Sequence, residues 1–313
     1  MENKGFIEES LSRIADPGAL LLNEPMRLHT TFRVGGNADF YIEVSSAEQL
    51  KDLVSFLSKQ RTPFFVLGNG SNLLVSDAGY RGVILSLSKY FQRIEVLSDS
   101  AEGSVILAES GALLGSVSKT AMEAGLKGLE FASGIPGSVG GAIVMNAGAY
   151  GGEMKQVVES VTLLDTERLA IEKRSCKEME FSYRDSLVKH GPYIVLETRL
   201  RLFPGNREEI RALIEELRQK RVEKQPLEYP SAGSTFKRPE GYFAGKLIED
   251  SGLRGYRVGD AQVSEKHCGF VINRGHATAA EIMTVIRDVS RIVLEKQGVQ
   301  LTPEIVMLGD FNE

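Results

Sequence analysis

Cysteine and histidine are scarce in this sequence, and their scarcity excludes several kinds of structure and site. The two cysteines, Cys176 and Cys268, lie far apart, and neither has a second thiol at the spacing of a metal site. A disulfide framework or a zinc site is therefore not expected. The four histidines never pair at the helical spacing that metal ligands use, so we predict no metal site.

Long apolar runs and basic stretches are also missing. No apolar run reaches the roughly 18 residues that a membrane-spanning helix needs, and the start MENKGFIEES is acidic and lacks the apolar core of a signal peptide. We therefore expect a cytoplasmic protein with no membrane partner. The net charge of -5 is spread over both signs, without a basic segment of the kind that binds nucleic acid, so nucleic acid is not an expected partner.

The length and composition are those of a globular protein with more than one domain. At 313 residues the chain exceeds the size at which one hydrophobic core remains efficient, so two or three domains are expected. Apolar residues make up 42% and charged residues 25%, which is the balance of a soluble globular protein.

Apolar residues recur at helical spacing in several segments that begin with capping residues. The cap signals are Ser46 with Gln49, Asn206, and Thr278 with Glu281. The helices predicted from them cover residues 46–60, 206–224 and a segment from Thr278 to Gly298, and a further helix is expected at 115–124.

Short apolar runs between these helices predict strands. The runs are FFVLG, GVILSL, EGSVILAES, VESVTLLD, PYIVLETRLRLF and, as a last strand, LTPEIVML. This mixture of elements predicts an α+β fold, with a domain boundary near residues 203–205.

Glycine is concentrated in three segments, residues 68–71, 134–141 and 146–152. Such segments let backbone N–H groups approach an anionic ligand without a β-carbon in the way. Each alone is more often a tight turn, but the three together favour a phosphate-bearing ligand. GNGSNLL is not the dinucleotide fingerprint, because its third glycine position is Leu73, and no Walker sequence is present.

Seven motifs follow one another along the chain: HTTFRVGGNAD, VLGNGSNLLV, GLEFASGIPGSVGGAIVMNAGAYG, FSYRDS, SAGSTFKRP, AGKLIEDSGLRGY and LTPEIVMLG. Together and in this order, they resemble the UDP-N-acetylenolpyruvoylglucosamine reductase family. The resemblance implies a two-subdomain FAD-binding unit of the vanillyl-alcohol-oxidase type, followed by an α+β substrate domain. The boundaries that it implies are 1–87 and 88–205 for the two FAD-binding subdomains and 206–299 for the substrate domain, with residues 300–313 returning to the first subdomain.

The resemblance also implies which residues bind FAD. The loops that hold the cofactor pyrophosphate in this family correspond here to Gly68, Asn69, Gly70, Ser71, Asn72, Gly134, Ile135, Pro136, Gly137, Ser138 and Gly141. Asn146, Gly148 and Tyr150 are expected beside the flavin, although a core position for Tyr150 is an alternative. Because no histidine lies beside these loops in the sequence, we predict that FAD is bound non-covalently.

Three further residues match the reacting groups of the family. Ser234 corresponds to the proton donor, although a lone serine is usually a turn or helix cap. Arg184 corresponds to the arginine that faces the substrate carboxylate, where a planar fork of donors suits two oxygens. Glu304 corresponds to its glutamate partner, which helps near a developing negative charge only if it is protonated or hydrogen-bonds the enol. An ordinary salt bridge is the alternative for Arg184 and Glu304.

Cationic residues near the segment SAGS (residues 231–234) are candidates for binding the nucleotide diphosphate of the substrate. They are Lys224, Lys237, Arg238 and Lys246. Each alone is more often a solvated surface charge. Arg238 occupies a position where one branch of the family has asparagine, and the chain lacks an insertion of that branch, so it resembles the shorter branch.

The function that the resemblance implies is a flavin-dependent reduction in peptidoglycan precursor synthesis. NADPH reduces FAD, and the reduced flavin then reduces UDP-N-acetylglucosamine enolpyruvate to UDP-N-acetylmuramate, in an enzyme expected to be monomeric. One alternative is an FAD-dependent oxidase on the same scaffold, with oxygen as acceptor. A second is a nucleotide-binding module without activity, against which the presence of Arg184, Ser234 and Glu304 counts.

Overall fold

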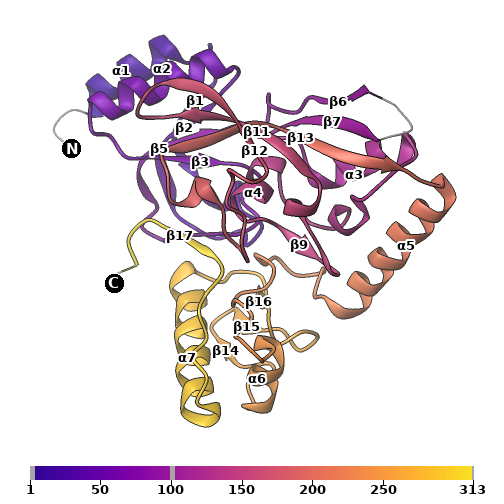
Figure 1. Cartoon of the computed structure of the whole chain (residues 1–313). Helices are drawn as coiled ribbons and strands as arrows, with labels where there is room; N and C mark the ends of the chain where they lie inside the picture. Colours follow the sequence, from indigo (N-terminus) through magenta and orange to yellow (C-terminus); the bar gives the residue numbers. More distant parts are fainter. Residues whose placement is uncertain (1–3, 99–102, 312–313) are drawn as a thin grey trace. The chain divides into compact units, whose positions relative to one another are not determined.

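The computed structural model describes residues 4–98 and 103–311, and the chain divides into two compact units (Figure 1). Unit 1 consists of Met1–Leu22, Phe40–Asn69 and Gly82–Lys220. Unit 2 consists of Asn23–Asp39, Gly70–Arg81 and Arg221–Glu313. The chain thus crosses between the units several times, so each unit is assembled from distant parts of the sequence.

The first layer of unit 1 packs two helices on a sheet. The helices are α1 (Lys4–Ile14) and α2 (Ala47–Lys59), and the sheet has the strand order β1 (Leu20–Pro25), β2 (Asn37–Glu43), β5 (Tyr80–Ser86) and β3 (Phe64–Leu67). Figure 1 shows α1 beside α2, and the Phe6 and Phe56 rings of these helices lie 6.2 Å apart. The core between helices and sheet includes Leu11, Leu53 and Ile42, all fully buried.

Helix α2 begins where its sequence predicts. The Ser46 Oγ atom accepts a hydrogen bond from the Gln49 N–H group at 3.1 Å. The returning bond differs from the expected capping box, because the Gln49 Oε1 atom accepts from the N–H group of Ser45 at 2.9 Å instead of that of Ser46. The cap therefore includes one residue more than the pattern implied.

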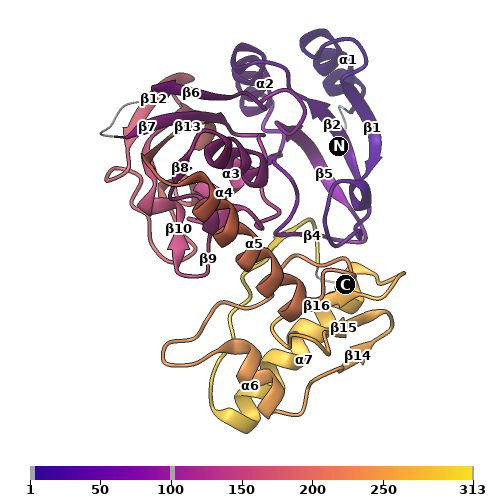
Figure 2. The same ribbon diagram turned by 90° about the vertical axis from the view of Figure 1, so that its right-hand side faces the viewer.

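The second layer of unit 1 is an antiparallel sheet covered by helices. Its strand order is β12 (Ala170–Ser175), β11 (Val158–Asp165), β13 (Tyr193–Pro204), β7 (Ser104–Glu109) and β6 (Ile94–Ser98), with β8 (Leu126–Lys127) also pairing with β13. Helices α3 (Leu114–Glu123) and α4 (Val139–Val144) bury Val117 and Ile143 in its core. Figure 2 shows α3 and α4 beside strands β7 and β13.

Helix α5 (Arg207–Lys224) follows this sheet and confirms the predicted helix and cap. The Asn206 Oδ1 atom accepts from the N–H groups of Glu208 and Glu209. Only part of the predicted apolar face is buried, since Ile210 and Leu217 are buried but Leu213 is 42% exposed. Leu213 therefore faces solvent and not a hydrophobic core.

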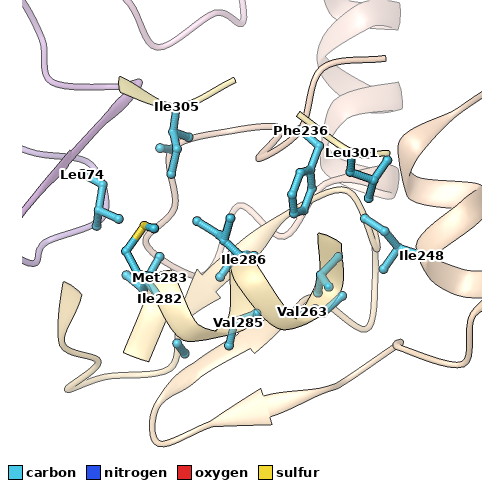
Figure 3. Packing of buried hydrophobic residues seen from close by; sticks show 14 of the residues in the cluster. Leu74, Phe236, Ile248, Val263, Ile282, Met283, Val285, Ile286, Leu301 and Ile305 are labelled. Carbon is cyan, nitrogen blue, oxygen red and sulfur yellow. The ribbon is translucent and has the colours of Figure 1, made fainter. Parts of the chain in front are cut away.

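Unit 2 has its own hydrophobic core (Figure 3). Its elements are α6 (Ala244–Asp250), α7 (Ala279–Gln297), the antiparallel strands β14 (Arg257–Val258), β15 (Ala261–Val263) and β16 (Val271–Asn273), and the parallel pair β4 (Leu73–Val75) and β17 (Val306–Leu308). Figure 3 shows Ile282 and Ile286 of α7 among Leu74, Phe236 and Ile305. The tail of the chain is thus built into unit 2 through β4.

The N-terminus of α7 is capped twice. The predicted capping box is confirmed, because Thr278 Oγ1 accepts from the Glu281 N–H group and Glu281 Oε2 accepts from the Thr278 N–H group, each at 3.1 Å. The Asp77 carboxylate also accepts from the N–H groups of Ala279 and Ala280, at 2.9 and 2.8 Å. The carboxylate thereby satisfies donors that a helix end otherwise leaves unpaired.

Along residues 4–98 and 103–311, none of the helices combines the length and the apolar composition needed to cross a membrane.

We predict that the variant Asp77→Ala has a free energy of unfolding about 1 to 2 kcal/mol lower than the wild type, because two N–H groups at the start of α7 lose their acceptor. Asp77→Asn keeps one side-chain oxygen and should lose less. Thermal unfolding followed by circular dichroism measures both. Equal stability of Asp77→Ala and the wild type would show that the cap contributes nothing.

Candidate active site

Two glycine-rich loops lie against each other in unit 1. A β-carbon on Gly68 would lie 2.2 Å from the Ser138 Oγ atom, so glycine permits this close approach. The Asn69 Nδ2 atom donates to the Pro136 carbonyl oxygen at 2.6 Å. The Ser138 side chain also caps α4, where it accepts from the Gly141 N–H group at 3.4 Å. These contacts bring together the two loops that the sequence assigned to one ligand.

Gly70, which follows Asn69 in the first glycine-rich loop, belongs to unit 2 and turns the chain sharply. Its φ is 58°, a left-handed conformation, and a β-carbon there would lie 2.0 Å from the His29 carbonyl oxygen. The Gly70 carbonyl accepts from the Thr31 N–H group at 3.2 Å. Both the conformation and the space thus require glycine at this position.

The backbone N–H groups of these loops suit an anionic ligand. Within the part of the chain that the structure describes, the N–H groups of residues 68–72 donate no hydrogen bond to protein atoms, and the same holds for Gly134, Gly137 and Ser138. Backbone donors rarely remain unpaired unless solvent or a ligand accepts from them. Consecutive unpaired donors at glycines are a common phosphate-binding arrangement, so the donors of unit 1, which are those of Gly68, Asn69, Gly134, Gly137 and Ser138, fit a pyrophosphate.

Gly148 and Tyr150 lie in a short β-hairpin whose turn has two residues. Strands β9 (Gly148–Ala149) and β10 (Gly152–Glu153) pair antiparallel, and Tyr150 and Gly151 between them have φ values of 53° and 87°. This is the backbone of a type I′ turn, which seldom accommodates an aromatic residue at its first central position. The Tyr150 side chain is 46% exposed, so its alternative assignment as a core aromatic is wrong.

Arg184 lies in a second tight turn of unit 1. Ser182 and Asp185 exchange backbone hydrogen bonds of 3.1 and 3.2 Å around it, and Arg184 has a left-handed φ of 56°. Its guanidinium lies over the Tyr183 ring, 5.3 Å from the centroid, and its Nη2 atom donates to the Gly148 carbonyl at 3.4 Å. The arginine and the hairpin are therefore neighbours.

The carboxylate of Asp185 stabilises the same turn. The His190 Nε2 atom lies 2.8 Å from Asp185 Oδ2, and the Lys189 ammonium donates to the Arg184 carbonyl at 3.1 Å. The hydrogen bond from His190, together with the charges of His190 and Lys189, holds the pKa of the Asp185 carboxyl below its usual range.

Ser234 and Glu304 are brought together in unit 2 through Thr235. The Ser234 side chain is exposed, whereas Thr235 is completely buried. The Glu304 N–H group donates to the Thr235 carbonyl at 2.8 Å, and the Asn72 Nδ2 atom donates to the Glu304 carbonyl at 3.2 Å. The segments of Ser234, Glu304 and the end of the first glycine loop are thus hydrogen-bonded neighbours.

The sequence predicted no role for Thr235, although its carbonyl joins the segments of Ser234 and Glu304. Its N–H group donates to the Gly269 carbonyl at 2.8 Å, and its Oγ1 atom accepts from the Val271 N–H group at 2.9 Å. A threonine between the motif residues Ser234 and Phe236 carries no signal of this role, because all its partners are distant in sequence. Nearby, burial lowers the pKa of His267, whose Nδ1 atom accepts from the Gly269 N–H group.

The four residues proposed from the sequence to bind the nucleotide diphosphate each have their own surroundings. Arg238 lies over the Phe243 ring at 4.0 Å and donates to the Tyr242 carbonyl. The Lys246 ammonium pairs with Asp250 at 2.7 Å. Lys224 is exposed at the end of α5, and Lys237 is partly buried, with its N–H group bonded to the Thr302 carbonyl at 2.8 Å.

Comparison with known families defines the class of protein. A family model described as "FAD binding domain" matches residues 38–167, and one described as "UDP-N-acetylenolpyruvoylglucosamine reductase, C-terminal domain" matches residues 225–308. The chain is therefore a flavin-binding protein in which an FAD-binding unit precedes a second, different domain. This confirms the expected α+β fold class.

Whole-chain relatives identify the family. A UDP-N-acetylenolpyruvoylglucosamine reductase of Agathobacter rectalis is 52% identical over 99% of this chain and 100% of its own length. One of Caldanaerobacter subterraneus subsp. tengcongensis is 52% identical over 97% of this chain and 99% of its own. The crystal structure of the Thermus caldophilus enzyme, at 36% identity, superposes with a TM-score of 0.76 over 93% of this chain and 98% of that one. The chain belongs to the UDP-N-acetylenolpyruvoylglucosamine reductase family, which confirms the resemblance found in the sequence.

We predict that Gly70→Ala loses most FAD binding, because the new methyl group would meet the His29 carbonyl and force the loop backbone to move. Gly18→Ala is the matched control, since Gly18 also has a positive φ, 79°, but no atom within 4 Å of a built β-carbon. Flavin absorbance per protein after gel filtration measures the outcome. Equal flavin content in the two variants would contradict the assignment of this turn.

Proposed function

We propose that this protein catalyses the NADPH-dependent reduction of UDP-N-acetylglucosamine enolpyruvate to UDP-N-acetylmuramate, with non-covalently bound FAD. The full-length identity of 52% to a reductase of that name carries the proposal. The unpaired N–H groups of the glycine loops and the presence of Arg184, Ser234 and Glu304 support it. The reaction places the protein in peptidoglycan precursor synthesis, and we propose a monomer in the cytoplasm.

Residues 68–72 and 134–138, with Gly141, are proposed to hold the FAD pyrophosphate through their backbone N–H groups. Asn146, Gly148 and Tyr150 are proposed to lie beside the flavin. When bound, FAD supplies hydride transfer from the nicotinamide to one alkene carbon of the substrate. The protein must then bind the substrate carboxylate, stabilise the developing enolate charge and deliver a proton to the other carbon.

Arg184 is proposed to bind the substrate carboxylate. Its guanidinium presents donors in one plane, which matches two carboxylate oxygens better than an ammonium does. The turn around Arg184 is hydrogen-bonded on both sides and braced by Lys189 and His190. A braced turn suits electrostatic stabilisation, because the donors need not reorganise when charge develops.

Ser234 is proposed to donate the proton from its Oγ atom, and Glu304 to assist at the developing charge. A hydroxyl is a weak acid in water, but a carbanion next to a carboxylate is a strong base, so positioning matters more than acidity. Thr235 supports this positioning, because it fixes the backbone next to Ser234 and accepts from the N–H group of Glu304.

The nucleotide diphosphate is proposed to bind among Lys224, Lys237, Arg238 and Lys246. Lys246 and Arg238 already have protein partners, so they would exchange these contacts for phosphate oxygens. We also propose the division of the chain into FAD-binding subdomains at 1–87 and 88–205 and a substrate domain at 206–299. Residues 300–313 would complete the first subdomain through the pairing of β17 with β4, whose residues lie in the range 1–87.

An anaerobic absorption titration tests the function. Addition of NADPH should bleach the flavin absorbance, and addition of the enolpyruvyl sugar should restore it without oxygen. Recovery that requires oxygen and ignores the sugar would support the FAD-dependent oxidase instead. A protein that remains colourless after reconstitution with FAD would contradict the cofactor assignment, and flavin that NADPH never reduces would favour a module without activity.

We predict that Ser234→Ala slows reoxidation of the reduced flavin by the enolpyruvyl sugar at least about 100-fold, the range of general acid catalysis. Reduction of the flavin by NADPH should continue at the wild-type rate. Ser231→Ala is the matched control, because Ser231 lies in the same loop and makes its contacts with Thr31 and Ile272 through its backbone. Stopped-flow absorbance separates the two half-reactions, and equal losses in both would refute the proton-donor role.

A further inference from the structure

The Asn146 side chain is buried and fully engaged by protein atoms. It is 1% exposed, and its Nδ2 atom donates to the Glu153 carboxylate and to the Ser182 carbonyl, each at 3.0 Å. Its Oδ1 atom accepts from the Lys155 N–H group at 2.9 Å. Because both amide hydrogens have protein acceptors, the side chain of Asn146 has no donor left for a ligand.

The Ser182 carbonyl, which Asn146 holds, belongs to the turn that presents Arg184. The Ser182 backbone also exchanges hydrogen bonds with Asp185 across this turn. A left-handed φ is unfavourable for arginine and persists only where the surroundings hold it. The bond from Asn146 is therefore one of the contacts that fix the direction of the guanidinium.

The segment on the other side of the turn is tied to the same region of unit 1. The Ser186 hydroxyl is buried and donates to the Val144 carbonyl, at the end of α4, at 2.9 Å. Helix α4 is capped by Ser138, in the second glycine loop. The segment 138–146 therefore connects the proposed cofactor loop to both sides of the turn that contains Arg184, through Ser182 on one side and Ser186 on the other.

We propose that Asn146 is a positioning residue for Arg184, acting on the substrate step through the Ser182 carbonyl. This inference rests on the proposed function, because it takes Arg184 to bind the substrate carboxylate. Asn146 itself does not touch the substrate. Its amide couples the backbone that follows the cofactor loop to the turn that presents the guanidinium, so both are held in one arrangement.

The test uses Asn146→Gly in the FAD-loaded, full-length protein. Asn146 has a φ of 40°, a conformation that glycine adopts without strain. The substitution therefore removes the three side-chain hydrogen bonds without imposing backbone strain, which alanine would add. Ser118→Ala is the matched control, since Ser118 is also 1% exposed in unit 1 and donates to a backbone carbonyl, that of Leu129, at 3.0 Å.

We expect Asn146→Gly to slow reoxidation of the reduced flavin by the enolpyruvyl sugar by roughly 10- to 100-fold, the effect of a small displacement of a binding group. Because Asn146 is also proposed to lie beside the flavin, reduction of the flavin by NADPH in the FAD-loaded protein should slow as well, but by a smaller factor than the substrate step. Ser118→Ala should lower the melting temperature and leave both half-reactions unchanged. Equal losses in both half-reactions of Asn146→Gly, or a selective loss in Ser118→Ala, would overturn the inference.

A double-mutant cycle with Arg184→Lys separates this inference from the proposed function. If Asn146 acts through Arg184, Asn146→Gly should slow the substrate step little further in the Arg184→Lys background. Multiplicative losses would show that Asn146 acts independently and would overturn the inference alone. A wild-type substrate step in Arg184→Lys itself would instead contradict the proposed role of the arginine.

If Asn146→Gly fails to fold, Ser186→Ala provides the same test from the other side of the turn. It removes the hydrogen bond to the Val144 carbonyl and should also slow the substrate step selectively, by a smaller factor. Unchanged half-reactions in Ser186→Ala would then contradict the proposal that these ties position the arginine.

Discussion

The left-handed turn at Gly70 is the constraint on which the rest of the candidate site depends. A β-carbon there would overlap the His29 carbonyl, so the close approach of two backbone segments fixes the path of the loop. Beyond the turn, Asn72 donates to the Glu304 carbonyl and accepts from the Val306 N–H group. The unpaired backbone donors lie on both sides of this turn, and Asn72, two residues beyond it, joins the loop to the segment that leads from Glu304 into β17.

Helix ends were predictable because their signals are local. The caps at Thr278 and Asn206 lie within three residues of the N–H groups that they satisfy, so the sequence contains the whole interaction. Helix α1 was not predicted from the sequence. Helix α6 was also missed, because it has seven residues, too few for periodicity to be recognised.

For the candidate site, the sequence predicted the residues that belong to short motifs but not the residues that position them. The motifs identified Ser234, Arg184 and the glycines, whose roles depend on residue type within a short pattern. The partners that position them are distant in sequence: Thr235 bonds to Gly269 and Val271, and Asn146 to Ser182. No local pattern encodes such contacts, because they arise only when separate segments pack together.

The proposed reactive side chains and the residues that hold them are different residues. Ser234 is exposed while its neighbour Thr235 is fully buried, and Arg184 is partly exposed while Asn146 is buried. A reacting group must be accessible to substrate, yet its backbone must not move when charge develops. Dividing these requirements between two residues satisfies both, because burial strengthens the hydrogen bonds of the holding residue without desolvating the reacting one. The precision of the site therefore depends on the buried polar neighbours as much as on the motif residues.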